Sequence, residues 1–163
     1  MELLRVYLQD HLATATGAVE LAKRAYGSNR GSEFGPGLAV VQQQTTYDRA
    51  ALLDLMRRLA VGPDRLKVGA AWTAEKAGRL KLNGRLCGYS PLSRVVELEG
   101  LRLLLVGQRQ MWETIERVLA DDPRLEGFDA ADRAVGIDDA LARLAELDRR
   151  ATALAFPPSA TPA

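Results

Sequence analysis

Apolar residues recur every three or four positions through most of this chain, and this spacing restricts its fold more than any other feature. The first two such stripes are Leu4, Leu8, His11, Ala15, Ala18 and Ala22, then Leu38, Val41, Thr45, Asp48, Leu52, Leu55 and Leu59. Residues at this spacing share one face of an α-helix. Ala and Leu, both strong helix formers, dominate the apolar set. The sequence therefore predicts an all-α protein.

Glycine and proline clusters divide the chain into five expected helices, at residues 2–26, 38–60, 65–82, 91–120 and 138–154. Gly27 is expected to end the first helix, and Ser90 with Pro91 has the pattern of a helix start. In the fourth helix the main apolar stripe is Leu98, Leu101, Leu105, Trp112, Ile115 and Leu119. Leu103, Leu104 and Val106 occupy its other faces, so its middle is predicted to be buried on nearly all sides.

Short connections between these helices favour antiparallel neighbours. The predicted fold is an antiparallel four-helix bundle with an added C-terminal helix at residues 138–154. Residues 121–137 are expected to be a linker. Residues 1–155 would form a single domain, and residues 156–163 would be a disordered tail.

Composition excludes several functions. The net charge of +1 gives no overall attraction to nucleic acid or membranes. One cysteine and one histidine exclude an internal disulfide and a histidine-rich metal or haem site. No phosphate-binding or dinucleotide-binding glycine motif is present, and no apolar run approaches the length of a membrane span. We therefore expect a cytoplasmic, non-enzymatic protein that needs no cofactor.

Four polar residues stand at inward positions of the first four expected helices: His11, Asp48, Glu75 and Glu99. Counting outward from the loop near residues 31 and 32 places His11 within one turn of Asp48. Inward carboxylates and histidines of this kind bind metal in some helical bundles, so these four could hold one metal ion. The alternative is a structural polar core, in which His11 bonds Asp48 and Glu75 or Glu99 pairs with an arginine such as Arg79.

A basic segment at residues 76–94 connects the third and fourth expected helices. Lys81, Arg85, Tyr89 and Arg94 are its candidate partner-binding residues. Cations with an aromatic ring suit phosphate, a nucleic-acid backbone or an acidic protein surface. The alternative is a solvated face on which Arg85 and Arg94 pair with the acid-rich residues 113–148. That acidic region and the basic one are expected to face each other within the chain or across an oligomer.

The run EKAGRLKLNGRLCGYSPLSRVVELEGL, at residues 75–101, resembles a set of uncharacterised bacterial helical proteins described as ferritin-like. The resemblance extends from the run YLQDHLATATGAVELAKR, at residues 7–24, to about residue 120. It implies a four-helix bundle with ancestral metal-binding positions. This chain lacks both Glu-x-x-His motifs of ferritins, and residues 42–44 are glutamines where a carboxylate-rich segment would be expected. Ferroxidase, iron-storage and oxygenase activities are therefore not expected.

These observations favour a protein that works by binding another macromolecule or by self-association. One alternative is a metal-binding protein that uses His11, Asp48, Glu75 and Glu99. Another is weak nucleic-acid binding through residues 76–94. A protein partner or a homo-oligomer is the expected association.

Overall fold

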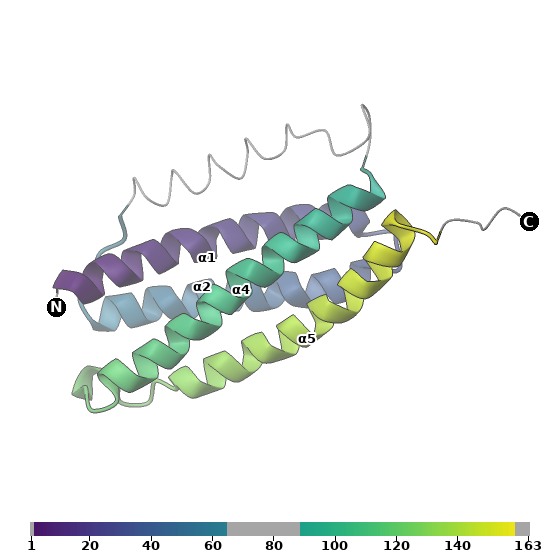
Figure 1. Ribbon diagram of the computed structural model, residues 1–163. Helices are drawn as coiled ribbons and strands as arrows, with labels where there is room; N and C mark the ends of the chain where they lie inside the picture. The colour runs from purple at the N-terminus through teal and green to yellow at the C-terminus, as the bar shows by residue number, and fades with distance from the viewer. Residues whose placement is uncertain (1, 65–88, 159–163) are drawn as a thin grey trace, which may run out of the picture.

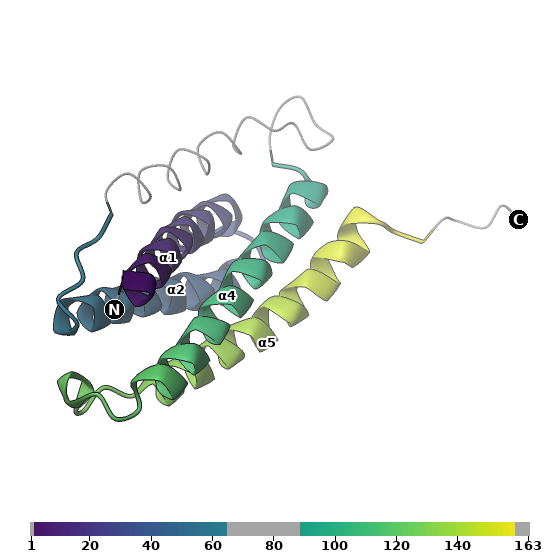
Figure 2. The same cartoon turned by 60° about the vertical axis from the view of Figure 1, so that its left-hand side comes forward.

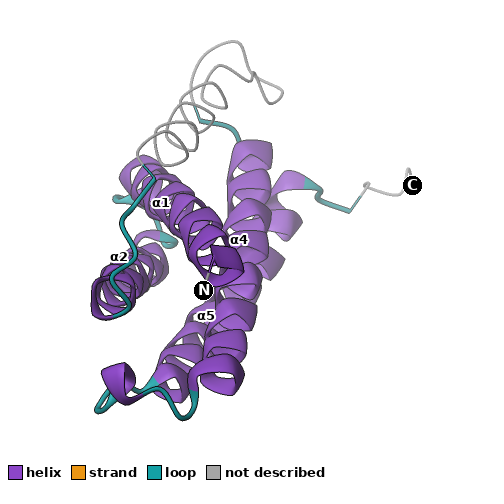
Figure 3. Ribbon diagram, turned by 90° about the vertical axis from the view of Figure 1, so that its left-hand side faces the viewer, coloured by secondary structure: helices purple, strands orange, loops and turns teal. Residues whose placement is uncertain are grey.

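The computed structural model describes residues 2–64 and 89–158, and these residues form helices and their connections without a strand (Figure 1, Figure 3). The long helices are α1 (Glu2–Asn29), α2 (Gly35–Arg58), α4 (Pro91–Leu119) and α5 (Ala130–Ala155). A short 3-10 helix, η1 (Pro123–Leu125), lies between α4 and α5. The all-α prediction is thus confirmed for the described residues. The expected helix at 65–82 lies outside them.

The four long helices pack as two pairs. Figure 2 shows α1 beside α2 and α4 beside α5. The pairs join because α4 also packs against α1, and α2 also packs against α5. Two hydrogen bonds, from Arg49 Nε to Thr16 Oγ1 and from Gln9 Nε2 to the carbonyl oxygen of Gly62, show that α1 and α2 run in opposite directions.

The predicted apolar stripes form the core. Those of α1, α2 and α4 are buried or partly buried along their whole length, including the polar members Thr45 and Asp48 of α2. The residues with no exposed surface include Leu52, Leu55, Leu101, Leu105 and Trp112. Burial of such side chains is the main free-energy gain of folding. The three-and-four spacing therefore identified the faces of α1, α2 and α4 that the core buries.

The end of α1 differs from the prediction. Gly27 does not end the helix, which continues to Asn29. Asn29 is 1% exposed, and its Nδ2 donates to the carbonyl oxygen of Ala25 over 2.8 Å. The side chain also bonds Tyr89 and Arg94, far along the chain. These tertiary contacts hold the extra turn against the low helix propensity of glycine.

The C-terminal region also differs from the prediction. α5 begins at Ala130, so residues 130–137 are helix and not linker. Asp129 caps this helix, since its side chain accepts a hydrogen bond from the backbone N–H of Asp132. α5 is not an addition to a finished bundle, because it packs along both α4 and α2 and buries Ile137 and Leu144 completely.

Candidate interaction surface

α4 begins with the capping arrangement that the sequence predicts. The Oγ of Ser90 accepts a hydrogen bond from the backbone N–H of Ser93 over 3.0 Å, and Pro91 stands in the first turn. The helix then runs 29 residues between α1 and α5. It thereby offers a long outer face on the side away from the core.

That outer face carries a row of apolar side chains. Leu92, Val96, Leu103 and Val106 are 37%, 40%, 76% and 45% exposed. With about 100° of rotation per residue, the four lie within roughly 80° of one another. Glu99 lies in the same row and is exposed. We call these five residues the α4 stripe.

The α4 stripe contradicts the prediction that the middle of this helix is buried on nearly all sides. Leu103 and Val106 are exposed. Leu105 has no exposed surface, and it lies about 200° around the helix from Leu103. The core therefore takes one face of α4 and leaves the opposite face to solvent.

Two opposite charges lie on or beside the stripe. Glu99 and Arg102 are both exposed, and within the described part of the chain neither forms a hydrogen bond or an ion pair. Arg109, about two turns beyond Arg102, behaves differently. It pairs with Glu113 and, over 2.6 Å, with Asp138 on α5. The side chains of Glu99 and Arg102 thus face solvent, whereas Arg109 joins α4 to α5.

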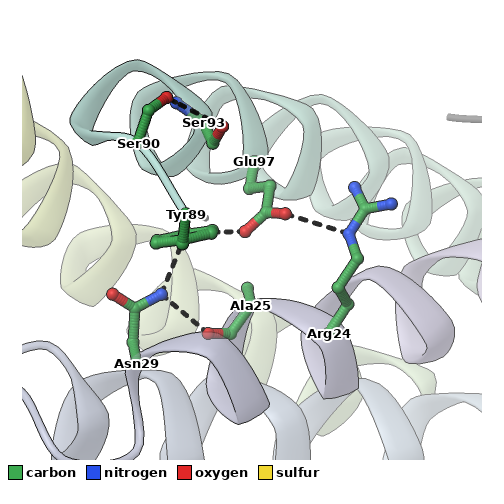
Figure 4. Close-up of polar contacts among 7 residues, drawn as sticks. All are labelled: Arg24, Ala25, Asn29, Tyr89, Ser90, Ser93 and Glu97. Carbon is green, nitrogen blue, oxygen red and sulfur yellow. Dashed lines mark hydrogen bonds and ion pairs between the residues drawn. The ribbon is translucent and has the colours of Figure 1, made fainter. Parts of the chain in front are cut away.

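A polar network fixes the start of α4 against α1 (Figure 4). The hydroxyl of Tyr89 donates to Glu97 Oε2 over 2.7 Å, and Arg24 Nε donates to Glu97 Oε1 over 2.9 Å. Asn29 Nδ2 donates to the Tyr89 hydroxyl over 2.9 Å. Burial, followed by the nearby charge of Glu97, raises the pKa of Tyr89. Each polar group here has a partner, as burial requires.

This network changes the interpretation of the predicted partner-binding residues. The Tyr89 hydroxyl bonds Glu97, and Arg94 belongs to the same network. Arg94 Nε donates to Asn29 Oδ1 over 2.7 Å, and its guanidinium lies 4.2 Å from the ring centre of Phe34. Tyr89 and Arg94 therefore serve internal contacts. The predicted pairing of Arg94 with the acid-rich residues 113–148 is wrong, because Arg94 bonds Asn29 instead. Lys81 and Arg85 lie outside the described residues.

The predicted metal ligands are not brought together within the described residues, and Glu75 lies outside these. Glu99 is exposed, so its predicted inward position is wrong, and the buried carboxylate of α4 is Glu97. In the described ranges, no three His, Cys, Asp or Glu side chains form a group that could hold a metal ion.

The predicted hydrogen bond between His11 and Asp48 is also wrong. Asp48 is 1% exposed. Among the described residues its carboxylate accepts from Gln44, over 3.1 Å, and its Oδ2 has no partner. Within the same residues His11 Nδ1 has no partner either, and its ring centre lies 4.4 Å from that of Tyr7. Counted from the bond between Arg49 and Thr16, His11 lies opposite residue 54, about 9 Å along the helix from Asp48.

Burial shifts the pKa of both residues. It lowers the pKa of His11, although the charge of Asp10 opposes this effect. It raises the pKa of Asp48 to about 7, and the hydrogen bond from Gln44 opposes that shift only in part. Burial thus disfavours the charged form of each group relative to the same group in water. This suits a structural core better than a charged binding site.

A cavity of about 900 Å³ lies at the other end of α4. Its apolar lining includes Ile115, Leu119, Leu125 and Phe128, and its acidic lining includes Glu116, Asp121, Asp122, Glu126 and Asp129. Sequence reasoning noted the acidic charge but not the hollow, because η1 and the early start of α5 create it. Arg94, the one described cation of the basic region, lies near the opposite end of α4. The acidic lining of the cavity therefore does not face it.

Comparisons with known proteins do not identify the chain, since no family model, curated protein or solved structure matches it. Among the described residues, no helix has the length and apolar character needed to cross a membrane. The geometry above is therefore the basis for any functional proposal.

Proposed function

We propose that this chain is a non-enzymatic binding protein whose docking surface is the α4 stripe. The observation that carries the proposal is Leu103, a large apolar side chain that is 76% exposed in the middle of α4. Val96 and Val106 continue the same row on either side. Single exposed apolar residues are ordinary, but a contiguous row marks interaction surfaces on soluble proteins.

The side chains that α4 contributes to the core of the described residues do not include the stripe. The opposite face of α4 supplies Leu98, Leu101, Leu105 and Trp112 to the core, each 0% or 1% exposed. The stripe side chains add little to that burial. Their apolar character is explained if association with another surface removes them from water.

The test compares Leu103→Lys with the matched control Val135→Lys. Val135 lies on α5 and is 61% exposed, so its replacement adds the same charge at a similar exposure away from the stripe. Complexes would be measured in two ways: light scattering on the purified chain, and quantitative mass spectrometry of proteins that co-purify from a cell extract. We expect Leu103→Lys to remove at least one complex that Val135→Lys retains. If Leu103→Lys retains every complex of the parent, the proposal is wrong.

The ferritin-like relationship and the cytoplasmic location form part of the same proposal. The resemblance of residues 75–101 and the helical packing of the described residues support the first. The lack of an extended apolar run in the sequence supports the second. The proposal involves no ferritin chemistry, because the chain lacks the Glu-x-x-His ligand motifs.

The two alternative functions have less support. A metal site would need His11, Asp48, Glu75 and Glu99 to converge, yet Glu99 is exposed on the outer face of α4. Nucleic-acid binding through residues 76–94 would use Tyr89 and Arg94, which already bond Glu97 and Asn29.

A further inference from the structure

We infer that the partner of the α4 stripe is the α4 stripe of a second copy of this chain, with the two helices antiparallel. This inference rests on the proposed function, because it names the occupant of the same surface. Three features of the described residues carry it: the spacing of the stripe, the positions of Glu99 in the stripe and Arg102 beside it, and the self-complementary pattern that these two charges form.

The spacing is that of a helix-pairing seam. Positions 92, 96, 99, 103, 106 and 110 are separated by four, three, four, three and four residues. Alternating steps of three and four keep side chains on the line where two helices pack together. Leu, Val, Leu and Val occupy four of these six positions, and all four are exposed. A second helix with the same seam fits this row along its length.

The charges select the antiparallel direction. In a parallel pair in register, identical seam positions face each other, so Glu99 would meet Glu99 of the partner subunit. Like charges at such a position are destabilising. An antiparallel pair centred on residue 101 removes this conflict, since it aligns Glu99 with the stretch that contains Leu103 of the partner subunit.

The same alignment pairs the charges. Glu99 of one copy comes beside Arg102 of the partner subunit, and Arg102 of the first copy comes beside Glu99 of the partner subunit. Each charge is exposed and forms no ion pair within the described part of its own chain. Two reciprocal ion pairs thus lie next to residue 101, the centre of the pair. On each side of them Val96 faces Val106 of the partner subunit.

The surface is small, so we expect a modest affinity. Four partly exposed aliphatic side chains per copy resemble the lower size class of protein interfaces. A dissociation constant roughly in the micromolar range follows. Sedimentation velocity and light scattering at protein concentrations up to about 500 µM would therefore detect the dimer.

The decisive experiment reverses the two charges separately. In a pair of Glu99→Arg chains, two arginines face two arginines, and in a pair of Arg102→Glu chains, two glutamates face two glutamates. We expect each variant alone to dimerise several-fold more weakly than the parent. An equimolar mixture should dimerise as well as the parent, because every cross-pair is then of opposite charge. The double variant Glu99→Arg/Arg102→Glu should also dimerise as well as the parent.

Cross-linking tests the direction of the helices. In a Cys87→Ser background, which removes the single native cysteine, chains with Val96→Cys would be mixed with chains with Val106→Cys. We expect a disulfide between unlike chains, and much less between two Val96→Cys chains. A preference for like chains would overturn the antiparallel arrangement.

Three other outcomes overturn this inference or a part of it, and only the second of them also removes the proposed function. A parent chain that stays monomeric at every concentration, but loses a different protein from extracts on Leu103→Lys, shows a hetero-partner. If Leu103→Lys sharply lowers the melting temperature of a monomer, the stripe is covered by residues of its own chain, and the proposed function is then wrong as well. If mixing the two charge variants gives no rescue, the reciprocal pairing is wrong.

Discussion

The inner and outer faces of α4 carry similar residues in different surroundings. Leu103 and Leu105 are two positions apart, yet one is 76% exposed and the other has no exposed surface. Glu97 and Glu99 show the same contrast. Glu97 bonds Arg24 and Tyr89, whereas Glu99 is exposed and has no ion-pair partner among the described residues. The angular position of a residue around α4, and not its type, decides whether its side chain packs inside the bundle.

The largest expected difference between the faces is in stability. Leu105→Ala should lower the free energy of unfolding by roughly 2–5 kcal/mol, since it leaves a cavity in the core. Leu103→Ala should change it by less than about 0.5 kcal/mol in the monomer. Denaturant unfolding at low protein concentration measures both values. Equal losses for the two variants would show that the outer face is also packed.

The next largest effect is the change of stability with pH that the buried carboxylate of Asp48 produces. Its pKa is raised from 3.8 to about 7 by burial, so the folded chain binds this proton more tightly than the unfolded chain. The stability that it contributes is complete below about pH 4 and is lost as the pH rises through 7. Between those values we expect the free energy of unfolding to fall by roughly 2–4 kcal/mol.

The substitution Asp48→Asn isolates this effect. Asn is neutral at every pH, so the variant should gain stability over the parent near pH 8 and lose most of that gain near pH 5. The lowered pKa of His11 acts in the opposite direction, because protonation of His11 in the bundle is unfavourable. Both proteins contain His11, so its contribution cancels in the difference between their free energies of unfolding. A difference in the free energy of unfolding that does not depend on pH would contradict the raised pKa of Asp48.

Glu97 and Glu99 of α4 are expected to differ in their contribution to stability, by a smaller amount than the effects above. Glu97→Gln keeps the shape but removes the charge that Arg24 faces, and both side chains are largely buried. We expect a loss of roughly 1–3 kcal/mol in the free energy of unfolding. Glu99→Gln should change monomer stability by less than about 0.5 kcal/mol but should weaken dimer formation. The opposite ranking would show that Glu99, and not Glu97, is the structural carboxylate.

Much of the fold could be predicted because apolar periodicity reports burial directly. The stripes of α1, α2 and α4 were found in this way. The outer face of α4 was missed although its signal was present. Leu103 lies about 200° from both Leu101 and Leu105, so it cannot share their side of the helix. The same phase argument distinguishes Glu97 from Glu99.

Other features depend on contacts that the local sequence does not reveal. α1 continues past Gly27 because Asn29 meets Tyr89 and Arg94 from the other half of the chain. For the same reason, Tyr89 and Arg94 could be read as partner contacts when they are internal ones. The distance between His11 and Asp48 was misjudged because the register of α1 on α2 depends on where both helices end.

The smallest expected effect concerns metal. A metal ion bound only by the folded state stabilises it by about 2.7 kcal/mol when present at 100 times its dissociation constant. His11 and Asp48 lie apart along the bundle, and Glu99 is on the outer face. We therefore expect chelator to leave the melting temperature unchanged within about 1 °C. Elemental analysis of the parent and of His11→Ala completes the test. About one metal ion per chain, lost in the variant, would show that the inner face of the bundle holds a binding site, and the outer face would no longer be the main candidate.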